Sequence, residues 1–163
     1  MHQEGRELHA ERTEQLRRVE LFASLKQRAL ERIASIAHEE SHARETSIFQ
    51  HGDVGDKVYL ILEGKVRIVR QIPGLGEEAL AVLGPGQVFG EMALLDESPR
   101  SADALCHDSC RLLAIAKEDL DDLLFQDKDL AYEVLWGTVH MLVERLRSTN
   151  DKLTLLGVSG RFS

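Results

Sequence analysis

The segment from Phe89 to Ala102 carries residue types that could hold a phosphate and a sugar together. Gly90 permits a backbone turn or a close ligand approach that other residues disfavour. Arg100 supplies a forked, permanently charged donor that suits two oxygens of one phosphate, and Ser101 adds a hydroxyl. Glu91 is an acceptor that would repel a phosphate but would suit a ribose hydroxyl. One sugar acceptor beside one phosphate donor predicts a nucleotide pocket.

The residues that follow Gly90 favour a single helical turn. Glu91 to Leu95 are good helix formers, and the free N–H groups of such a turn attract anions. Pro99 stiffens the returning chain. The competing interpretation is a surface turn closed by a salt bridge between Glu91 and Arg100. Each residue taken singly favours that interpretation, but the combination at this spacing favours a binding site.

The run Phe-Gly-Glu-Met-Ala-Leu-Leu, followed after four residues by Arg-Ser-Ala, resembles the phosphate-binding cassette of cyclic nucleotide-binding domains. This family includes cAMP-responsive bacterial transcription regulators and the regulatory subunits of cAMP-dependent protein kinase. The resemblance covers roughly residues 20 to 155. It implies that Glu91 accepts a hydrogen bond from the ribose 2′-hydroxyl and that Arg100 pairs with the exocyclic phosphate oxygens.

The same resemblance implies the rest of the ligand site. Backbone N–H groups near Ala93 and Ala102 and the hydroxyl of Ser101 would complete the phosphate cradle, and Gly90 would contact the sugar through its backbone. The full set of expected ligand-binding residues is Gly90, Glu91, Met92, Ala93, Arg100, Ser101, Ala102, Thr149 and Asn150. The expected ligand is cAMP in preference to cGMP, with no cofactor and no metal beside it.

Seven residues near the C-terminus repeat with the spacing of a coiled coil. They are Leu135, Val139, Leu142, Leu146, Thr149, Leu153 and Leu156. Steps of four and three residues alternate without a break, and all but one of the seven are aliphatic. This narrow seam predicts a parallel coiled coil between two copies of the chain, whereas packing on the rest of the domain is the competing interpretation. Trp136 and Val143 lie off the seam and are expected to pack on the domain.

Thr149 is the polar member of this seam, where a polar residue usually serves register or a specific contact. The surrounding Arg-Leu-Arg-Ser-Thr-Asn-Asp-Lys-Leu resembles Arg-Leu-Gln-Val-Thr-Ser-Glu-Lys-Val of the bacterial regulators. That resemblance implies that Thr149, and Asn150 from the partner chain, lie at the adenine amino group; Asn in place of Ser changes the reach. A ligand that contacts both the strands and this helix would favour the docked, paired helix. The alternative is a dimeric interaction module with a vestigial pocket.

The spacing of apolar residues, which indicates the elements that must position these side chains, changes along the chain. Short runs rich in Val and Ile recur between residues 41 and 116 with glycine turns, which predicts an antiparallel sandwich or barrel. We therefore expect a mixed α+β fold, a β-roll or jelly roll (double-stranded β-helix) flanked by N-terminal helices and a long C-terminal helix. The expected parts are an N-terminal helical extension over 1–19, the β-roll with short flanking helices over 20–126, a dimerisation helix over 127–156 and a flexible tail over 157–163.

Local signals refine these boundaries. Strands are expected at 58–62, 65–70, 79–83 and 111–116. Gly64 stands where a tight hairpin would need a positive φ. Ser24 is placed to cap a helix, with Gln27 three residues later as its capping-box partner.

Two other clusters suggest metal chemistry. His38-Glu39-Glu40-Ser41-His42 fits the zinc-protease pattern, but it falls where helical spacing ends, so we interpret it as a solvated junction. Cys106 and Cys110 are loosely spaced and are interpreted as flanking a turn between two strands. A cupin-like metal enzyme is thus the remote alternative, and the chain is not expected to be an enzyme.

Charge and composition limit the classes of binding partner that we expect. The 163 residues contain 20 Lys and Arg against 28 Asp and Glu, so the formal net charge is −8. This charge opposes binding to nucleic acid and to anionic membranes. No signal peptide or membrane span is visible, which predicts a cytoplasmic protein. The sequence ends seven residues after Leu156 without a basic recognition helix, so we expect no direct DNA binding and an output through an unknown protein partner.

Overall fold

The computed structural model describes residues 2–159, with side chains for residues 5–92 and 95–157. The helices are α1 (His2–Arg17), α2 (Gln27–Ile36), the short 3-10 helix η1 (Glu91–Leu94), α3 (Lys117–Gln126) and α4 (Lys128–Ser159). The strands are β1 (Ala37–His42), β2 (Ser47–Phe49), β3 (Lys57–Glu63), β4 (Val66–Ile72), β5 (Gly76–Leu83), β6 (Val88–Phe89), β7 (Asp103–Cys106) and β8 (Cys110–Ala116).

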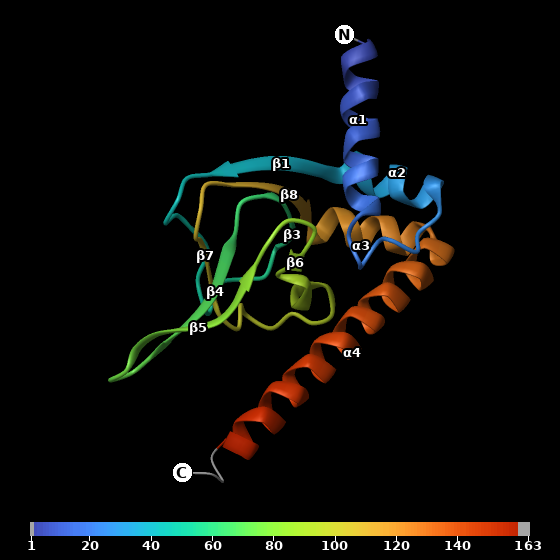
Figure 1. Ribbon diagram of the computed structural model, residues 1–163. Coiled ribbons are helices and arrows are strands. Elements are labelled where there is room, and N and C mark those ends of the chain that lie inside the picture. The colour runs from blue at the N-terminus through green and yellow to red at the C-terminus, as the bar shows by residue number, and fades with distance from the viewer. Residues whose placement is uncertain (1, 160–163) are drawn as a thin grey trace.

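The strands form two antiparallel four-stranded sheets that face each other as a roll (Figure 1). One sheet has the order β1-β8-β3-β6 and the other has the order β2-β7-β4-β5. The helices lie at one end of this roll, and α4 extends away from them along its side. This arrangement confirms the predicted mixed α+β roll with a long C-terminal helix.

Strands β3 and β8 supply two hydrophobic cores at once. Tyr59 and Ile61 point between the two sheets, whereas Val58 and Leu60 point to the helical side. Both faces of β3 are therefore buried, which explains why its sequence is a continuous apolar run instead of an alternating one. The edge strand β5 is exposed along nearly its whole length and pairs only with β4.

The predicted capping box at Ser24 and Gln27 is wrong. Helix α2 begins at Gln27, its N-cap is Lys26, and no side chain caps it. The residues before it form successive tight turns, in which the N–H of Phe22 donates to Val19 and that of Leu25 donates to Phe22. Because Phe22 and Leu25 are buried in the helical core, packing sets this path in place of a cap.

Gly64 has the predicted positive φ of 83°, but it does not turn a hairpin. The strands on its two sides, β3 and β4, belong to different sheets, so Gly64 marks the corner where the chain passes between them. A Cβ atom here would lie 2.4 Å from the Ser109 carbonyl oxygen and 2.9 Å from Cys110 Sγ. Glycine is needed at this corner for close approach as well as for backbone conformation.

The apolar residues that anchor helix α4 lie between positions 130 and 141. Leu130, Val134 and Met141 are buried on the side that faces the rest of the protein. Gly137 lies so close to the 18–25 turn that a Cβ atom would come 2.3 Å from the Leu21 carbonyl oxygen. Every described side chain from residue 146 onwards is exposed.

The expected packing of Trp136 and Val143 on the domain is wrong. Trp136 is 55% exposed, its ring stacks on Tyr132 at 6.5 Å and meets His140 edge-on, and Val143 is also exposed. Successive helix residues are rotated by about 100°. The stripe that contains Val134 and Met141 is the one that faces the roll, so Trp136 lies on the opposite side.

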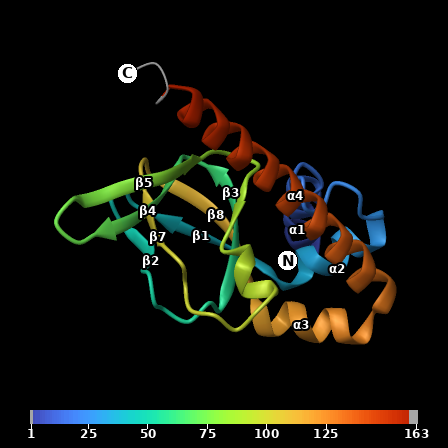
Figure 2. The same ribbon diagram turned by 90° about the horizontal axis from the view of Figure 1, so that it is seen from below.

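The long helix is otherwise close to its prediction. It begins one residue after the expected start and continues to Ser159, so residues 157–159 are helical; residues 160–163 of the expected tail lie outside the described part. Seen from below, α4 runs from the helical end of the molecule past the roll toward the β4–β5 side (Figure 2). Within residues 2–159, no helix has the length and apolar character needed to span a bilayer.

Candidate functional site

A cavity of about 400 Å³ lies between the roll and α4. Its floor is the segment Phe89–Ala102 that the sequence singled out, including η1. One wall is apolar and comes from the β4–β5 strands, through Ile68, Leu80 and Leu83. The opposite wall comes from α4 and is polar, with Arg145, Ser148, Thr149 and Lys152. Two segments far apart in sequence thus face each other across one space.

The turn at Gly90 shapes the floor. Gly90 is the N-cap of η1 and has a φ of 75°, in the left-handed region. A Cβ atom on it would lie 2.8 Å from Arg100 Nη1 and 3.1 Å from the Lys57 carbonyl oxygen. The predicted unusual turn is present, and glycine is required there because the arginine packs directly on the backbone.

Arg100 is only 6% exposed, which is unusual for arginine. Its Nη2 donates to the Lys57 carbonyl at 2.8 Å and its Nη1 donates to the Gly90 carbonyl at 3.3 Å. Its guanidinium lies over the Phe49 ring, 4.1 Å from the centroid. Nε is buried and has no hydrogen-bond partner among the described residues. The group is therefore fixed in place, and its Nε is a buried donor that no described residue satisfies.

The charge on this guanidinium is only lightly compensated. Its nearest carboxylate is that of Asp56, 3.7 Å from Nη2, and Asp56 itself is well exposed. Burial lowers the pKa of Arg100, while Tyr59 and Asp56 oppose that shift. Arginine stays protonated through such shifts, so the floor of the cavity presents a buried positive charge. An anion with several oxygens is its natural partner.

The main chain of Arg100 is held as firmly as its side chain. Its N–H donates to the Asp53 carbonyl at 2.8 Å, and its carbonyl accepts from the Gly52 N–H at 2.9 Å. The 50–53 turn is therefore hydrogen-bonded to the returning loop of the cassette. These hydrogen bonds explain how an arginine in a loop keeps one position.

Glu91 is 5% exposed and pairs with Arg145 of α4, not with Arg100. The competing interpretation of a Glu91–Arg100 salt bridge is thus wrong. Arg145 Nη1 donates to Glu91 Oε1, and Arg145 Nη2 donates to the Val88 carbonyl at 2.6 Å. One arginine of α4 therefore contacts both an acidic side chain and a backbone carbonyl of the roll. The second oxygen of Glu91 remains able to accept from a hydroxyl.

Most of the other predicted site residues line the cavity, but Asn150 does not. Ser101, Ala102 and Met92 line the cavity, and the Ser101 hydroxyl donates to the Met92 sulfur at 3.8 Å. The backbone of Ala93 lies in η1, and its side chain is outside the described set. Thr149 lines the cavity and its hydroxyl donates to the Arg145 carbonyl at 2.9 Å. Asn150 is exposed and does not line the cavity of its own chain.

Sequence reasoning missed Phe49 and Arg145. Phe49 belongs to β2 and reaches Arg100 because β2 pairs with β7, just after the cassette. Nothing local in the sequence indicates that pairing. Arg145 carried a usable signal, because it precedes Thr149 by four residues and therefore lies on the same helix face.

The histidine cluster that suggested a metal surrounds a single carboxylate. His38 and His42 both lie on strand β1 and contact the Glu40 side chain, which also accepts from Lys57 Nζ at 2.7 Å. Burial would raise the pKa of Glu40, but the bonds from Lys57 and His42 outweigh it and lower that pKa. Among the residues that the structure describes, no group of three or more His, Cys, Asp or Glu is arranged to hold a metal ion.

Cys106 and Cys110 flank the turn between β7 and β8, as predicted, and both are free thiols. Burial and the neighbouring Cys110 thiol raise the pKa of Cys106 to about 12. Both side chains are buried, and Cys110 Sγ donates to the Lys65 carbonyl at 3.2 Å. A thiol with so high a pKa is a poor nucleophile, so packing is the role that its surroundings support.

Comparisons with known proteins match this chain to one family and one fold. Residues 39–127 match the family described as the cyclic nucleotide-binding domain. The cyclic AMP receptor protein of Thermus thermophilus is 42% identical over 109 residues, which is 67% of this chain and 49% of that protein. This chain therefore spans about half the length of that relative.

Solved structures show the same fold. The N-terminal domain of a transcriptional regulator from Streptomyces coelicolor has a TM-score of 0.71 and 35% identity, covering 85% of this chain and 94% of that one. The regulatory domain of Toxoplasma gondii PKA, solved with cAMP, has a TM-score of 0.65 and 28% identity, covering 70% of this chain and 43% of that one. The chain that carries the buried Arg100, the paired Glu91 and the cavity therefore shares its fold with these two domains.

Proposed function

This chain belongs to the cyclic nucleotide-binding domain family, and from that premise we propose that it is a sensor for a 3′,5′-cyclic nucleotide, with cAMP preferred over cGMP. The family is one of binding domains, in line with the prediction that the chain is not an enzyme. One observation carries the proposal. Arg100 is buried and fixed by two backbone carbonyls, and its Nε has no partner among the described residues.

Arg100 and Glu91 would each bind a different part of the ligand. Arg100 would hold the exocyclic oxygens of the cyclic phosphate, assisted by the Ser101 hydroxyl and the N–H groups of η1. Glu91 would accept from the ribose 2′-hydroxyl with the oxygen that Arg145 does not use. Repulsion between Glu91 and the phosphate is limited, because Arg145 already compensates that carboxylate.

The preference for adenine rests on Thr149. Its hydroxyl donates to the Arg145 carbonyl, so its lone pairs are what it presents to the cavity. Lone pairs accept from the adenine amino group, whereas guanine carries a carbonyl oxygen at that place. A relative named as a cyclic AMP receptor protein and a similar domain solved with cAMP support the same choice.

The response would come from α4. A ligand that contacts both Arg100 and Thr149 stabilises the docked helix relative to any undocked position. At a concentration 100-fold above its dissociation constant, such a ligand contributes about 2.7 kcal/mol to the state that binds it. The docked helix would in turn present its apolar seam for pairing.

We expect that pairing to be with a second copy of this chain. The exposed seam residues are Leu135, Val139, Leu146, Leu153 and Leu156, which keep the spacing of a parallel coiled coil. Sedimentation analysis should show a dimer for the unchanged chain and a monomer for Leu146→Glu. Lys128→Glu, at the far end of the helix, is the matched control and should stay dimeric. A monomeric unchanged chain with and without cAMP would contradict this assembly.

Calorimetric titration with cAMP and cGMP tests the binding function. Arg100→Ala should lower cAMP affinity by about 100-fold or more, because it leaves the phosphate charge without its paired donor, a loss of about 3 kcal/mol. Arg70→Ala removes one exposed arginine of β4 outside the cavity and should leave affinity unchanged. Absence of binding by the unchanged chain, or equal affinity for Arg100→Ala, would refute the proposal.

A further inference from the structure

The side of α4 that faces the roll changes character along its length. Val134 and Met141 on this side are buried and apolar, and they anchor the helix. Beyond them the same stripe carries Arg145, Ser148 and Lys152, which all line the cavity. Arg145 is committed to Glu91 and to a backbone carbonyl. The helix therefore places a second cation, Lys152, seven residues or about two turns further along, over the same space.

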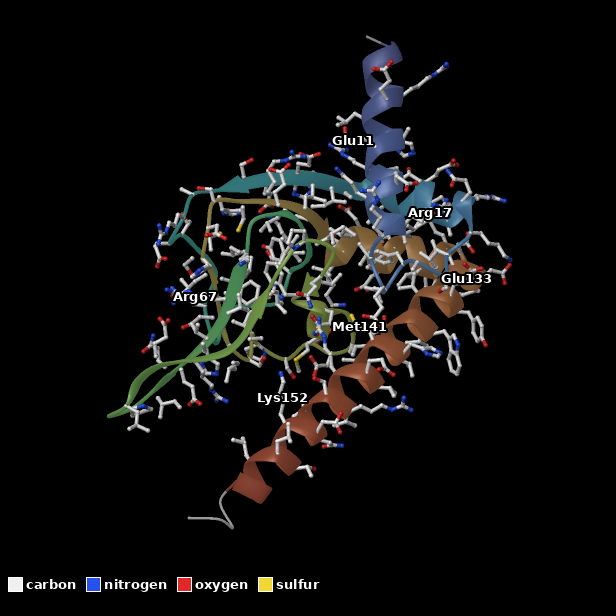
Figure 3. All side chains as sticks on the ribbon, in the orientation of Figure 1. Glu11, Arg17, Arg67, Glu133, Met141 and Lys152 are labelled. Carbon is white, nitrogen blue, oxygen red and sulfur yellow. The ribbon has the colours of Figure 1, made fainter. Side chains whose placement is uncertain are left out.

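Lys152 has no assigned structural role. In the part of the chain that the structure describes, no carboxylate lies within 4.0 Å of its ammonium group and no hydrogen bond uses it. Figure 3 shows Lys152 on the side of α4 that faces the strands of the roll. An exposed lysine that lines a cavity without a partner has three N–H donors available to a ligand.

The nearby Thr149 has the complementary hydrogen-bonding character. Its hydroxyl donates to the Arg145 carbonyl and so presents an acceptor to the cavity. Lys152, three residues later, presents donors only. The facing wall of Ile68, Leu80 and Leu83 is apolar and suits the flat face of a base. One acceptor beside one donor matches the adenine edge, where the amino group lies next to a ring nitrogen that accepts.

We propose that Lys152 is a further base-binding residue that donates to the adenine ring nitrogen beside the amino group whose hydrogen Thr149 accepts. The inference rests on the proposed binding of a cyclic nucleotide and deepens it. Guanine would place its carbonyl oxygen against the Thr149 acceptor, and it offers Lys152 an accepting ring nitrogen only on the N7 side, because its N1 carries a hydrogen. Thr149 thus discriminates against guanine, while Lys152 supplies affinity for the purine edge.

The test pairs a variant with altered ligands. Lys152→Met keeps the length and apolar stem of the side chain and removes the donors. Titrations would use cAMP and its 1-deaza and 7-deaza analogues, each of which lacks one of the two ring nitrogens that flank the amino group. Arg147→Met, on the same helix but outside the cavity, is the control for loss of one positive charge.

The expected result is a coupling between variant and analogue. Lys152→Met should lower cAMP affinity by about 10-fold, the usual scale for a hydrogen bond to a charged group. It should cause no further loss with whichever deaza analogue lacks the contacted nitrogen, and the control should bind cAMP as the unchanged chain does. Equal losses for all three ligands would mean that Lys152 serves an anionic group, and no loss would mean that it has no role; either result overturns the inference.

The two proposals fail in different ways. If the unchanged chain binds cAMP in an Arg100-dependent manner but Lys152→Met shows no coupling to either analogue, only the inference about Lys152 is refuted. If the unchanged chain binds none of the ligands, the sensor function fails and the inference fails with it.

Discussion

The two walls of the cavity hold their charged groups in different ways. On the roll, Arg100 is buried, both of its amino nitrogens donate to backbone carbonyls, and its plane lies on the Phe49 ring. On α4, the side chains at the cavity are half-buried or exposed, and Arg145 provides the hydrogen bonds to the roll.

This difference indicates how binding and response are divided. The roll is organised before a ligand arrives, so little ordering cost opposes phosphate binding there. Helix α4 is anchored at Leu130 to Met141 and lies over the cavity with few contacts beyond that point, so its position can depend on the ligand. Affinity should therefore come mainly from the roll, and the conformational response from the helix.

Arg145→Ala is the largest test of this division. The change leaves the buried Glu91 carboxylate without its partner, which should cost about 1–3 kcal/mol of stability in the ligand-free chain. We expect the lower half of that range, because Arg145 is itself partly exposed. Urea unfolding, compared with Arg147→Ala as the control, measures the effect. Stability equal to that of the control would show that this ion pair does not hold α4 on the roll.

Phe49→Leu tests the organisation of the roll wall. The leucine keeps an apolar side chain beneath Arg100 but removes the ring, a contact of about 0.5–2 kcal/mol. Affinity for cAMP should fall about threefold to tenfold by calorimetry, while α4 stays docked. Phe125→Leu, at an exposed position of α3, is the matched control and should leave cAMP affinity unchanged. Unchanged affinity for Phe49→Leu would mean that the two carbonyls suffice to hold the guanidinium.

The floor of the cavity could be predicted from the sequence because it is contiguous. Gly90, Glu91 and Arg100 lie within one short segment, and their types and spacing indicate a tight turn followed by a returning loop. The contact between Phe49 and Arg100 could not be predicted, since it depends on the pairing of β2 with β7. Arg145 lies between these cases, because helical spacing places it on the Thr149 face but does not identify its partner.

The fold shows the same limit. Glycine turns and apolar runs predicted β3, β4, β5 and β8 to within a few residues but gave no bounds for the other four strands. The residues around Gly64 also do not indicate which sheet each strand joins. The seam of α4 was visible, but Trp136 was assigned to the wrong side because the buried stripe is set by Val134, Gly137 and Met141. Local sequence specifies elements, whereas long-range pairing decides which faces are covered.

The smallest expected effect concerns the first residue that fixes α4. Asp127 Oδ1 accepts from the Leu130 N–H at 3.0 Å, and its other oxygen pairs with Arg32. The Leu130 hydrogen bond, followed by the Arg32 charge, lowers the pKa of Asp127. Because the folded-state pKa is lowered, its contribution to stability is complete above the ordinary value of about 3.9 and is lost as the pH falls through the lowered value.

Asp127→Asn should therefore destabilise the chain at neutral pH, and its difference from the unchanged chain should shrink as the pH falls below about 4. Asparagine can still accept from Leu130 but carries no charge for Arg32, so the loss is modest. Asp129→Asn removes a charge from the same helical turn without these two contacts and serves as the control. Thermal unfolding over this pH range measures both. A difference that stayed constant with pH would show that the charge on Asp127 does not help to anchor α4.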